Sequence, residues 1–283
     1  MSIAIDHDSL IGKRQRNEDK HFVFQNINGE DPSKAAINLY LVCDGHGGTR
    51  ISKFLYDSLT PILIDKRLKG NARVVSLCDT DETKARALKK KLRSGSVCSL
   101  KQAIKTSDLV VEAAHAKVSF EIAKQALLCR KDVLVMSIGG VLGSEKKLFA
   151  IPRKNKARIY FPRGAICGLD GLKALIPAGI EGITLRTMKH PRALEGADYI
   201  VKNKIDLSRI KTNKVIFRGV AYEAVKAFPQ NINVVALLCI AACGLVVPRV
   251  EIIASPGQTR NIHVIEIRSK AARLLIRCEN VPS

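Results

Sequence analysis

The sequence predicts an α/β protein in which a parallel sheet covered by helices is followed by a mixed α/β domain. Between residues 67 and 162, short apolar runs alternate with segments of helical periodicity, which is typical of parallel strands buried on both faces. From about Gly164 onward, the strand-like segments read as those of a second sheet. The length of 283 residues is enough for two domains with cores of their own.

The first predicted strand of this sheet is residues 72–77, a mostly apolar run whose valines suit a buried position. A helix over 80–92 follows it, and Thr80 or Asp81 is a suitable N-cap. The other strands predicted in this part are 109–113, 133–137 and 158–161, and the other helix is 118–128.

The second part is predicted to hold four strands joined by helices. The predicted strands are 183–188, 214–217, 250–253 and 263–267, and the predicted helices are 169–175 and 222–227. An apolar run at 234–247 is too short to span a bilayer, and it fits either a buried strand or a buried helix.

The first 66 residues have a different pattern. Strand-like stretches at 21–25 and 37–43 are followed by a glycine cluster at 44–48 and a helical pattern at 51–64. No apolar core of a secretory signal stands at the N-terminus, so we expect a cytoplasmic protein with no membrane partner.

The net charge of +21 would attract polyanions, but the excess is spread along the chain and aromatic residues make up only 5%. We therefore do not expect nucleic acid as a partner; a positive field also favours an anionic dinucleotide and a dicarboxylate. The eight cysteines form no C-x-x-C pair, and we interpret them as reduced thiols.

Small residues follow three predicted strands, in loops at 112–115, 137–140 and 163–166. Ligands bind at these strand ends in open α/β sheets, although turns commonly contain glycine and alanine without a ligand. The order of five motifs is more specific. LVVEAAH (109–115), KDVLVMSIG (131–139), GAICGLD (164–170), AYEAVKAFPQNINV (221–234) and NIHVI (261–265) together resemble the aspartate dehydrogenase family.

The resemblance implies a reaction in which NAD or NADP accepts a hydride from Cα of L-aspartate. The product, iminoaspartate, hydrolyses to oxaloacetate and ammonia or feeds NAD biosynthesis. The position that matches the family's active-site histidine is His263, and imidazole titrates in the range needed for proton transfer. Positions that match cofactor contacts are Ala165 and Asn233. We also expect a homodimer.

Arg163 and Lys189 carry the charge needed to hold the substrate carboxylates. The chain also departs from the family. The family has Ser in place of Arg163, Ala or Gly in place of Cys167, an acidic residue in place of Arg218, Asp in place of Ser255 and Glu in place of Val264. The match ends before the family's Asn-Pro-Lys-Thr-Ser segment and closing helix.

A pyrophosphate-binding loop is expected after the first strand of a dinucleotide-binding sheet. The candidate is LYLVCDGHGG (39–48), which puts Cys43, Gly45 and Gly48 at the three glycine positions of the fingerprint. The acidic residue after the second strand is Asp79. On this interpretation Gly45, Gly48 and Asp79 contact the cofactor.

The same residues also resemble a second family. GKRQRNED (12–19) and VCDGHGG (42–48) are similar to the opening of metal-dependent Ser/Thr protein phosphatases. That resemblance implies an Mg²⁺ or Mn²⁺ site made by Glu18, Asp19, Asp44 and the Gly45 carbonyl, with Arg14 binding phosphate. The alternatives to the dehydrogenase are therefore a metal-dependent phosphatase-like module and an inactive fusion product.

These resemblances predict three regions. Residues 1–66 are a phosphatase-like N-terminal segment, 67–162 a dinucleotide-binding domain, and 163–283 a substrate and catalytic domain that is C-terminally truncated relative to the family. We hypothesise that the strand at 39–43 and the helix at 50–59 supply the first βα unit of a Rossmann-like sheet, which makes that unit atypical.

Overall fold

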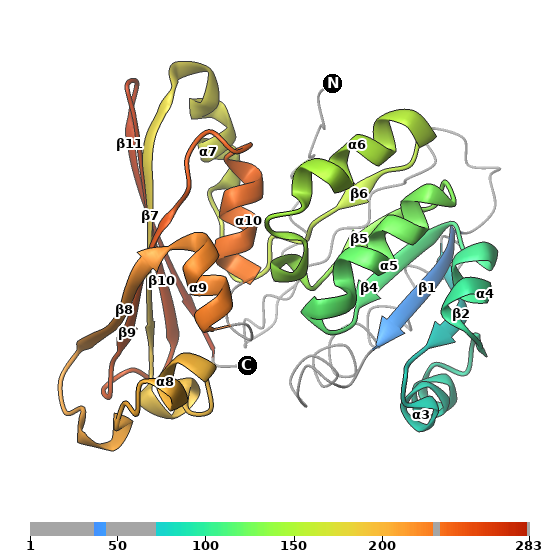
Figure 1. Cartoon of the computed structure of the whole chain (residues 1–283), viewed down its shortest axis with the longest axis horizontal. Helices are drawn as coiled ribbons and strands as arrows, with labels where there is room; N and C mark the ends of the chain where they lie inside the picture. Colours follow the sequence, from blue (N-terminus) through green and yellow to red (C-terminus); the bar gives the residue numbers. More distant parts are fainter. Residues whose placement is uncertain (1–36, 44–71, 229–232, 282–283) are drawn as a thin grey trace, which may run out of the picture.

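A computed structural model describes residues 37–43, 72–228 and 233–281. The predicted strand at 21–25, the glycine cluster at 44–48 and the helical segment at 51–64 lie outside these residues. The described residues form two parts, each built on one sheet, and this mixed α/β arrangement confirms the predicted fold class (Figure 1).

The first sheet is parallel throughout, with the strand order β3-β2-β1-β4-β5-β6. This is the strand order of Rossmann dinucleotide-binding sheets. Strand β1, from the N-terminal region, pairs with β2 on one side and β4 on the other. The strands are β1 (Ile37–Cys43), β2 (Ala72–Cys78), β3 (Ser96–Val97), β4 (Leu109–Ala113), β5 (Asp132–Val135) and β6 (Ile159–Tyr160).

Among the described residues, four helices accompany this sheet: α3 (Glu82–Leu92), α4 (Leu100–Thr106), α5 (Ala116–Leu128) and α6 (Glu145–Asn155). Helix α3 begins after Asp81, whose carboxylate accepts a hydrogen bond from the Thr83 N–H at 3.0 Å, as an N-cap does. Helix α5 begins at the end of β4, where the Nδ1 atom of His115 accepts from the Lys117 N–H at 3.1 Å. These caps place both helix N-termini beside the carboxyl edge of the sheet.

The second sheet has the order β11-β10-β7-β9-β8. Strands β7 and β9 are parallel, and the other neighbouring pairs are antiparallel. The strands are β7 (Ile180–Lys189), β8 (Lys214–Val220), β9 (Arg249–Ala254), β10 (Asn261–Ser269) and β11 (Arg273–Asn280). The first four were predicted with shorter bounds, and β11 was not predicted.

Helices α7, α9 and α10 lie between the second sheet and the N-terminal part (Figure 1). The face of the sheet that they cover is called the inner face below. The apolar run left open as strand or helix is α10 over most of its length. The helices are α7 (Leu169–Leu175), α8 (Asp198–Lys202), α9 (Ala221–Ala227) and α10 (Asn233–Ala241), with 3-10 turns η4 (Ile138–Val141), η5 (Ile176–Ala178), η6 (Pro191–Leu194) and η7 (Leu207–Arg209).

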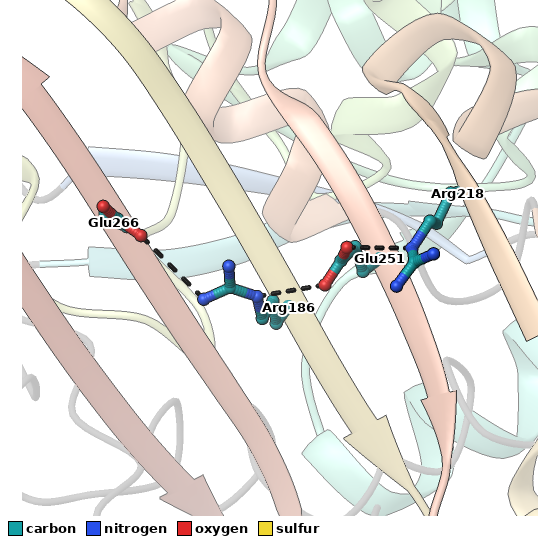
Figure 2. A network of polar contacts seen from close by, with 4 residues as sticks. All are labelled: Arg186, Arg218, Glu251 and Glu266. Carbon is teal, nitrogen blue, oxygen red and sulfur yellow. Dashed lines mark hydrogen bonds and ion pairs between the residues drawn. The ribbon is translucent and has the colours of Figure 1, made fainter. Parts of the chain in front are cut away.

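The opposite face of the second sheet, the outer face, carries a row of charges that crosses four strands (Figure 2). Glu251 on β9 lies between two arginines, Arg186 on β7 and Arg218 on β8, each with its Nε atom 3.0 Å from a Glu251 oxygen. The Nη1 atom of Arg186 is also 3.9 Å from Glu266 on β10. Arg218, noted above as a departure from the family, is therefore an ion-pair partner on the face away from the helices.

No helix in the described part of the chain is long and apolar enough to cross a membrane.

Candidate functional site

Glu112 organises the carboxyl edge of the first sheet. It stands near the end of β4 and is 0% exposed. Its Oε1 atom accepts a hydrogen bond from the Ala114 N–H at 2.8 Å. Its Oε2 atom accepts from the Ser119 hydroxyl at 2.8 Å and from the Ser137 N–H at 3.2 Å. One carboxylate thus connects the loop after β4, helix α5 and the loop after β5.

Burial raises the pKa of Glu112 to about 7, and the hydrogen bonds from Ser119, Ser137 and Ala114 act in the opposite direction. No role was predicted for Glu112 from the sequence. The available signal was a charged residue inside the otherwise apolar run LVVEA, because a buried charge requires partners.

Asn233 joins the two parts of the molecule at this edge. It is the first residue of α10, and its Oδ1 atom accepts from the Gly139 N–H at 3.2 Å. Its Nδ2 group donates to the Met136 carbonyl at 3.0 Å. Both partners belong to the loop after β5, so Asn233 holds that loop in place. Its predicted contact with the cofactor stays a prediction.

Two neighbouring glycines in that loop have different surroundings. A Cβ atom on Gly140 would lie 2.0 Å from the Ala116 carbonyl oxygen, so glycine is needed there for close packing on α5. A Cβ atom on Gly139 would meet only the Asn233 Oδ1 atom, at 3.8 Å. The backbone at Gly139 therefore has room beside it at the carboxyl edge of the sheet.

Asp79 follows β2 at the same edge, since the strands are parallel. Its Oδ1 atom accepts from the Asp81 N–H at 2.8 Å. The other predicted cofactor residues, Gly45 and Gly48, lie outside the described residues. Asp79 thus lies at the carboxyl edge of the sheet, and its predicted contact with the cofactor stays a prediction.

The phosphatase-like metal set of Glu18, Asp19, Asp44 and Gly45 also lies outside the described residues. Within the described ranges, no three His, Cys, Asp or Glu side chains gather as metal ligands would.

His263 lies on β10 and is 5% exposed. Its Nδ1 atom is 3.1 Å from the Thr187 hydroxyl on the neighbouring strand β7, directly opposite in the register. Burial lowers the pKa of His263 to about 4, and the positive charge of Lys189 adds to this effect. The imidazole is therefore neutral near pH 7.

Lys189 stands two residues after Thr187 on β7, so both side chains project from the same face of the strand. It is 8% exposed, and its carbonyl accepts from the Ser255 N–H at 2.8 Å. The Ser255 hydroxyl in turn contacts Asn213. Lys189 thus brings a largely buried positive charge near His263.

Ala165 lies in the loop between β6 and α7, where its carbonyl accepts from the Asn280 side chain of β11 at 3.0 Å. Strand β11 pairs with β10, and Cys278 stands directly opposite His263. The structure therefore connects the Ala165 loop to His263 through one strand. Arg163, a predicted carboxylate ligand, instead pairs with Asp170 at 3.0 Å between Nη2 and Oδ1.

Comparisons with known proteins agree with this geometry. Residues 170–283 match the family model of the aspartate dehydrogenase C-terminal domain, and residues 57–162 match that of the homoserine dehydrogenase NAD-binding domain. An L-aspartate dehydrogenase of Methanococcoides burtonii is 46% identical over 191 residues, which cover 66% of this chain and 70% of that protein. The chain belongs to the L-aspartate dehydrogenase family. A relative of that name from Methanocaldococcus jannaschii is 37% identical, with 79% and 83% covered.

Solved structures show the same fold. Aspartate dehydrogenase from Thermotoga maritima superposes with a TM-score of 0.63 at 23% identity, and the match covers 86% of this chain and 89% of that one. Myo-inositol dehydrogenase from Lactobacillus casei has a TM-score of 0.51 at 12% identity, with 88% and 75% covered. The arrangement of a Rossmann-like sheet followed by a mixed α/β domain is therefore that of known dehydrogenases.

Members of the L-aspartate dehydrogenase family are oxidoreductases, and this chain is an NAD(P)-dependent one by its family and its NAD-binding domain. The described residues fit such a cofactor. The strand order is that of dinucleotide-binding sheets, and Gly139 leaves room beside the backbone at the carboxyl edge. These relatives give no support to the phosphatase alternative.

Proposed function

We propose that this protein oxidises L-aspartate to iminoaspartate, with NAD⁺ or NADP⁺ as the hydride acceptor. The observation that carries the proposal is a buried, neutral His263 beside the positive charge of Lys189, in a chain of the L-aspartate dehydrogenase family. When bound, the nicotinamide cofactor supplies the acceptor for the hydride that leaves Cα.

His263 acts as the general base in this proposal. The substrate enters as an ammonium ion, and its nitrogen must lose a proton before the C–N bond gains double-bond character. The Thr187 hydroxyl orients the ring through Nδ1 at 3.1 Å, which leaves Nε2 for the substrate. Because the pKa of His263 is lowered to about 4, the ring is unprotonated at neutral pH, which is the form that a general base requires.

Lys189 is the proposed ligand of a substrate carboxylate. It lies on the inner face with Thr187 and His263, and its burial strengthens its attraction for an anion. Arg163 pairs with Asp170, so its guanidinium group already has a carboxylate partner within the chain. Lys189→Met keeps a side chain of similar length without the charge, so it should raise KM for L-aspartate much more than KM for the cofactor.

The test of substrate class is the rate of NADH or NADPH formation with L-aspartate, D-aspartate, L-glutamate and L-alanine. The proposal predicts the highest kcat/KM with L-aspartate. Equal rates with L-alanine would show that no second carboxylate is recognised. No reduction of either cofactor by any of these amino acids would overturn the proposal.

We also propose that the protein is a homodimer that forms through the outer face of the second sheet. Leu275 of β11 is 66% exposed on this face, and the row of alternating charges in Figure 2 is able to pair with a twofold copy of itself. Light scattering should give twice 31.0 kDa for the wild type and 31.0 kDa for Leu275→Glu. A wild type of 31.0 kDa would refute the dimer.

The proposed compartment is the cytoplasm, where NAD(P) is available and thiols stay reduced. The free cysteines among the described residues are consistent with such a compartment. Fractionation of cells, followed by immunodetection, should recover the protein with cytoplasmic markers; recovery in another fraction would contradict this assignment.

A further inference from the structure

Two cysteines that are 111 positions apart in the sequence touch in the structure. The Sγ atoms of Cys167 and Cys278 are 3.4 Å apart. Cys167 is exposed in the loop before α7, and Cys278 is half-buried on β11.

This thiol pair lies beside residues of the proposed active site. Cys167 is two residues from Ala165, the predicted cofactor contact. Cys278 stands directly opposite His263 in the pairing of β11 with β10, and Asn280 of the same strand donates to the Ala165 carbonyl. A change in the distance between the two sulfur atoms therefore acts on the loop that holds Ala165.

Glycines bound the loop that carries Cys167. Gly164 has a φ of +63°, and nothing lies within 4 Å of the position of its missing Cβ atom. Gly168 has a φ of +76° and packs on β11, where an added Cβ atom would lie 2.2 Å from Ile276. The loop is thus anchored on β11 at Gly168 and has space to move at Gly164.

We propose that Cys167 and Cys278 form a reversible disulfide in response to hydroperoxides, and that this bond slows the enzyme by pulling the 164–168 loop toward β11. A disulfide needs an S–S distance of about 2.05 Å, so the two sulfur atoms must close from 3.4 Å by roughly 1.3 Å. A displacement of this size near a reacting centre is enough to lower turnover by about tenfold or more.

The chemistry balances with the hydroperoxide as the oxidant. The Cys167 thiolate attacks the peroxide, the O–O bond breaks, and a sulfenic acid forms with release of the alcohol, or of water from hydrogen peroxide. Cys278 then attacks that sulfur, the S–O bond breaks, and water leaves as the S–S bond forms. Burial raises the pKa of the Cys278 thiol, so the exposed Cys167 reacts first. A dithiol reductant returns both electrons and both protons.

The bond itself is independent of the proposed function, whereas its effect on turnover rests on that function. The experiment treats the reduced full-length chain with hydrogen peroxide, followed by peptide mass spectrometry, NADH titration by fluorescence and an L-aspartate assay. We expect a linked peptide pair containing Cys167 and Cys278, a rise in the dissociation constant for NADH, and a loss of turnover. Dithiothreitol should reverse all three changes.

The variants Cys167→Ala and Cys278→Ala should stay reduced at this pair and keep their turnover after peroxide. The matched control is Cys129→Ala, because Cys129 is an exposed cysteine at the end of α5, and this variant should respond as the wild type does. Absence of the linked peptide, or a linked protein with unchanged NADH affinity and turnover, would overturn the inference. If the disulfide forms and alters NADH affinity while reduced protein leaves L-aspartate unoxidised, the proposed function fails instead.

Discussion

His263 is held on the inner face of β10 by burial and by the Thr187 hydroxyl, and its pKa is lowered to about 4. In the unfolded chain the same group has a pKa of about 6.5. Between these values the unfolded state binds a proton that the folded state does not bind. The contribution of His263 to stability is therefore complete above the unfolded value and is lost as the pH falls toward 4.

Lowering the pH from 7 to 5 should change the free energy of unfolding of the wild type and of His263→Gln by different amounts. We predict that this change is about 2 kcal/mol less favourable for the wild type than for His263→Gln. Glu112 contributes with the opposite sign, because its raised pKa of about 7 makes the folded state bind more protons in this window. Because Glu112 is present in both proteins, the difference between their pH dependences of unfolding free energy reports the contribution of His263 alone. Urea denaturation at each pH measures it, and equal pH slopes for both proteins would contradict the buried, neutral imidazole.

Glu112 is the acceptor for three donors from two loops and a helix. Replacing it with alanine leaves the Ala114 N–H, the Ser137 N–H and the Ser119 hydroxyl without this acceptor. We expect Glu112→Ala to lower the unfolding free energy by at least about 3 kcal/mol, and Ser119→Ala, which removes one donor, by about 1 kcal/mol. Chemical denaturation measures both. Similar small losses in the two variants would contradict the central role of the carboxylate.

Elements fixed by local pattern were predicted well. The bounds of β4 and α7 match the predictions at 109–113 and 169–175, because a mostly apolar strand and a short amphipathic helix have clear local signals. Helices α4 and α6 were not predicted. Helix α4 buries only Ala103 and Ile104, and α6 contains Pro152, so neither has a strong helical pattern.

Strand β11 was also missed, because Leu274 and Leu275 stand next to each other and hide its alternation. Long-range pairing with β10 determines its conformation. In the candidate site, too, only part of the arrangement could be predicted from the sequence. His263 followed from the family resemblance, whereas the roles of Glu112 and the contact of Cys167 with Cys278 depend on a register between distant segments.

At the scale of the element, the packing of η4 on α5 gives a test with an internal control. Gly140→Ala places its methyl group 2.0 Å from the Ala116 carbonyl, so one backbone must shift, at a cost of about 2 kcal/mol or more. Gly139→Ala makes only an ordinary contact with Asn233 and should change stability by less than about 1 kcal/mol. Thermal and urea unfolding compare the two variants. Equal stability of both would show that η4 does not pack on α5 this closely.

In the whole molecule, Asn233 joins the two parts through hydrogen bonds with Gly139 and Met136, and the Tyr222 hydroxyl donates to Glu145. Helices α7, α9 and α10 bury the inner face of the second sheet beside the first part (Figure 1). This arrangement brings the loops after β4 and β5 toward the same side of the molecule as the helix that begins at Asn233. The proposed reaction requires both parts, since the predicted cofactor contacts lie in both parts and His263 lies on the second sheet.

The most direct test of this account follows the hydrogen at Cα of the substrate. The protein is incubated with NAD⁺, or NADP⁺, and L-aspartate that carries deuterium at Cα, and the reduced cofactor is analysed by mass spectrometry. The account predicts that one deuterium enters the cofactor and that His263→Ala slows this transfer by about 10²-fold to 10⁴-fold while retaining the fold. Reduced cofactor without deuterium, or an unchanged rate in His263→Ala, would contradict it.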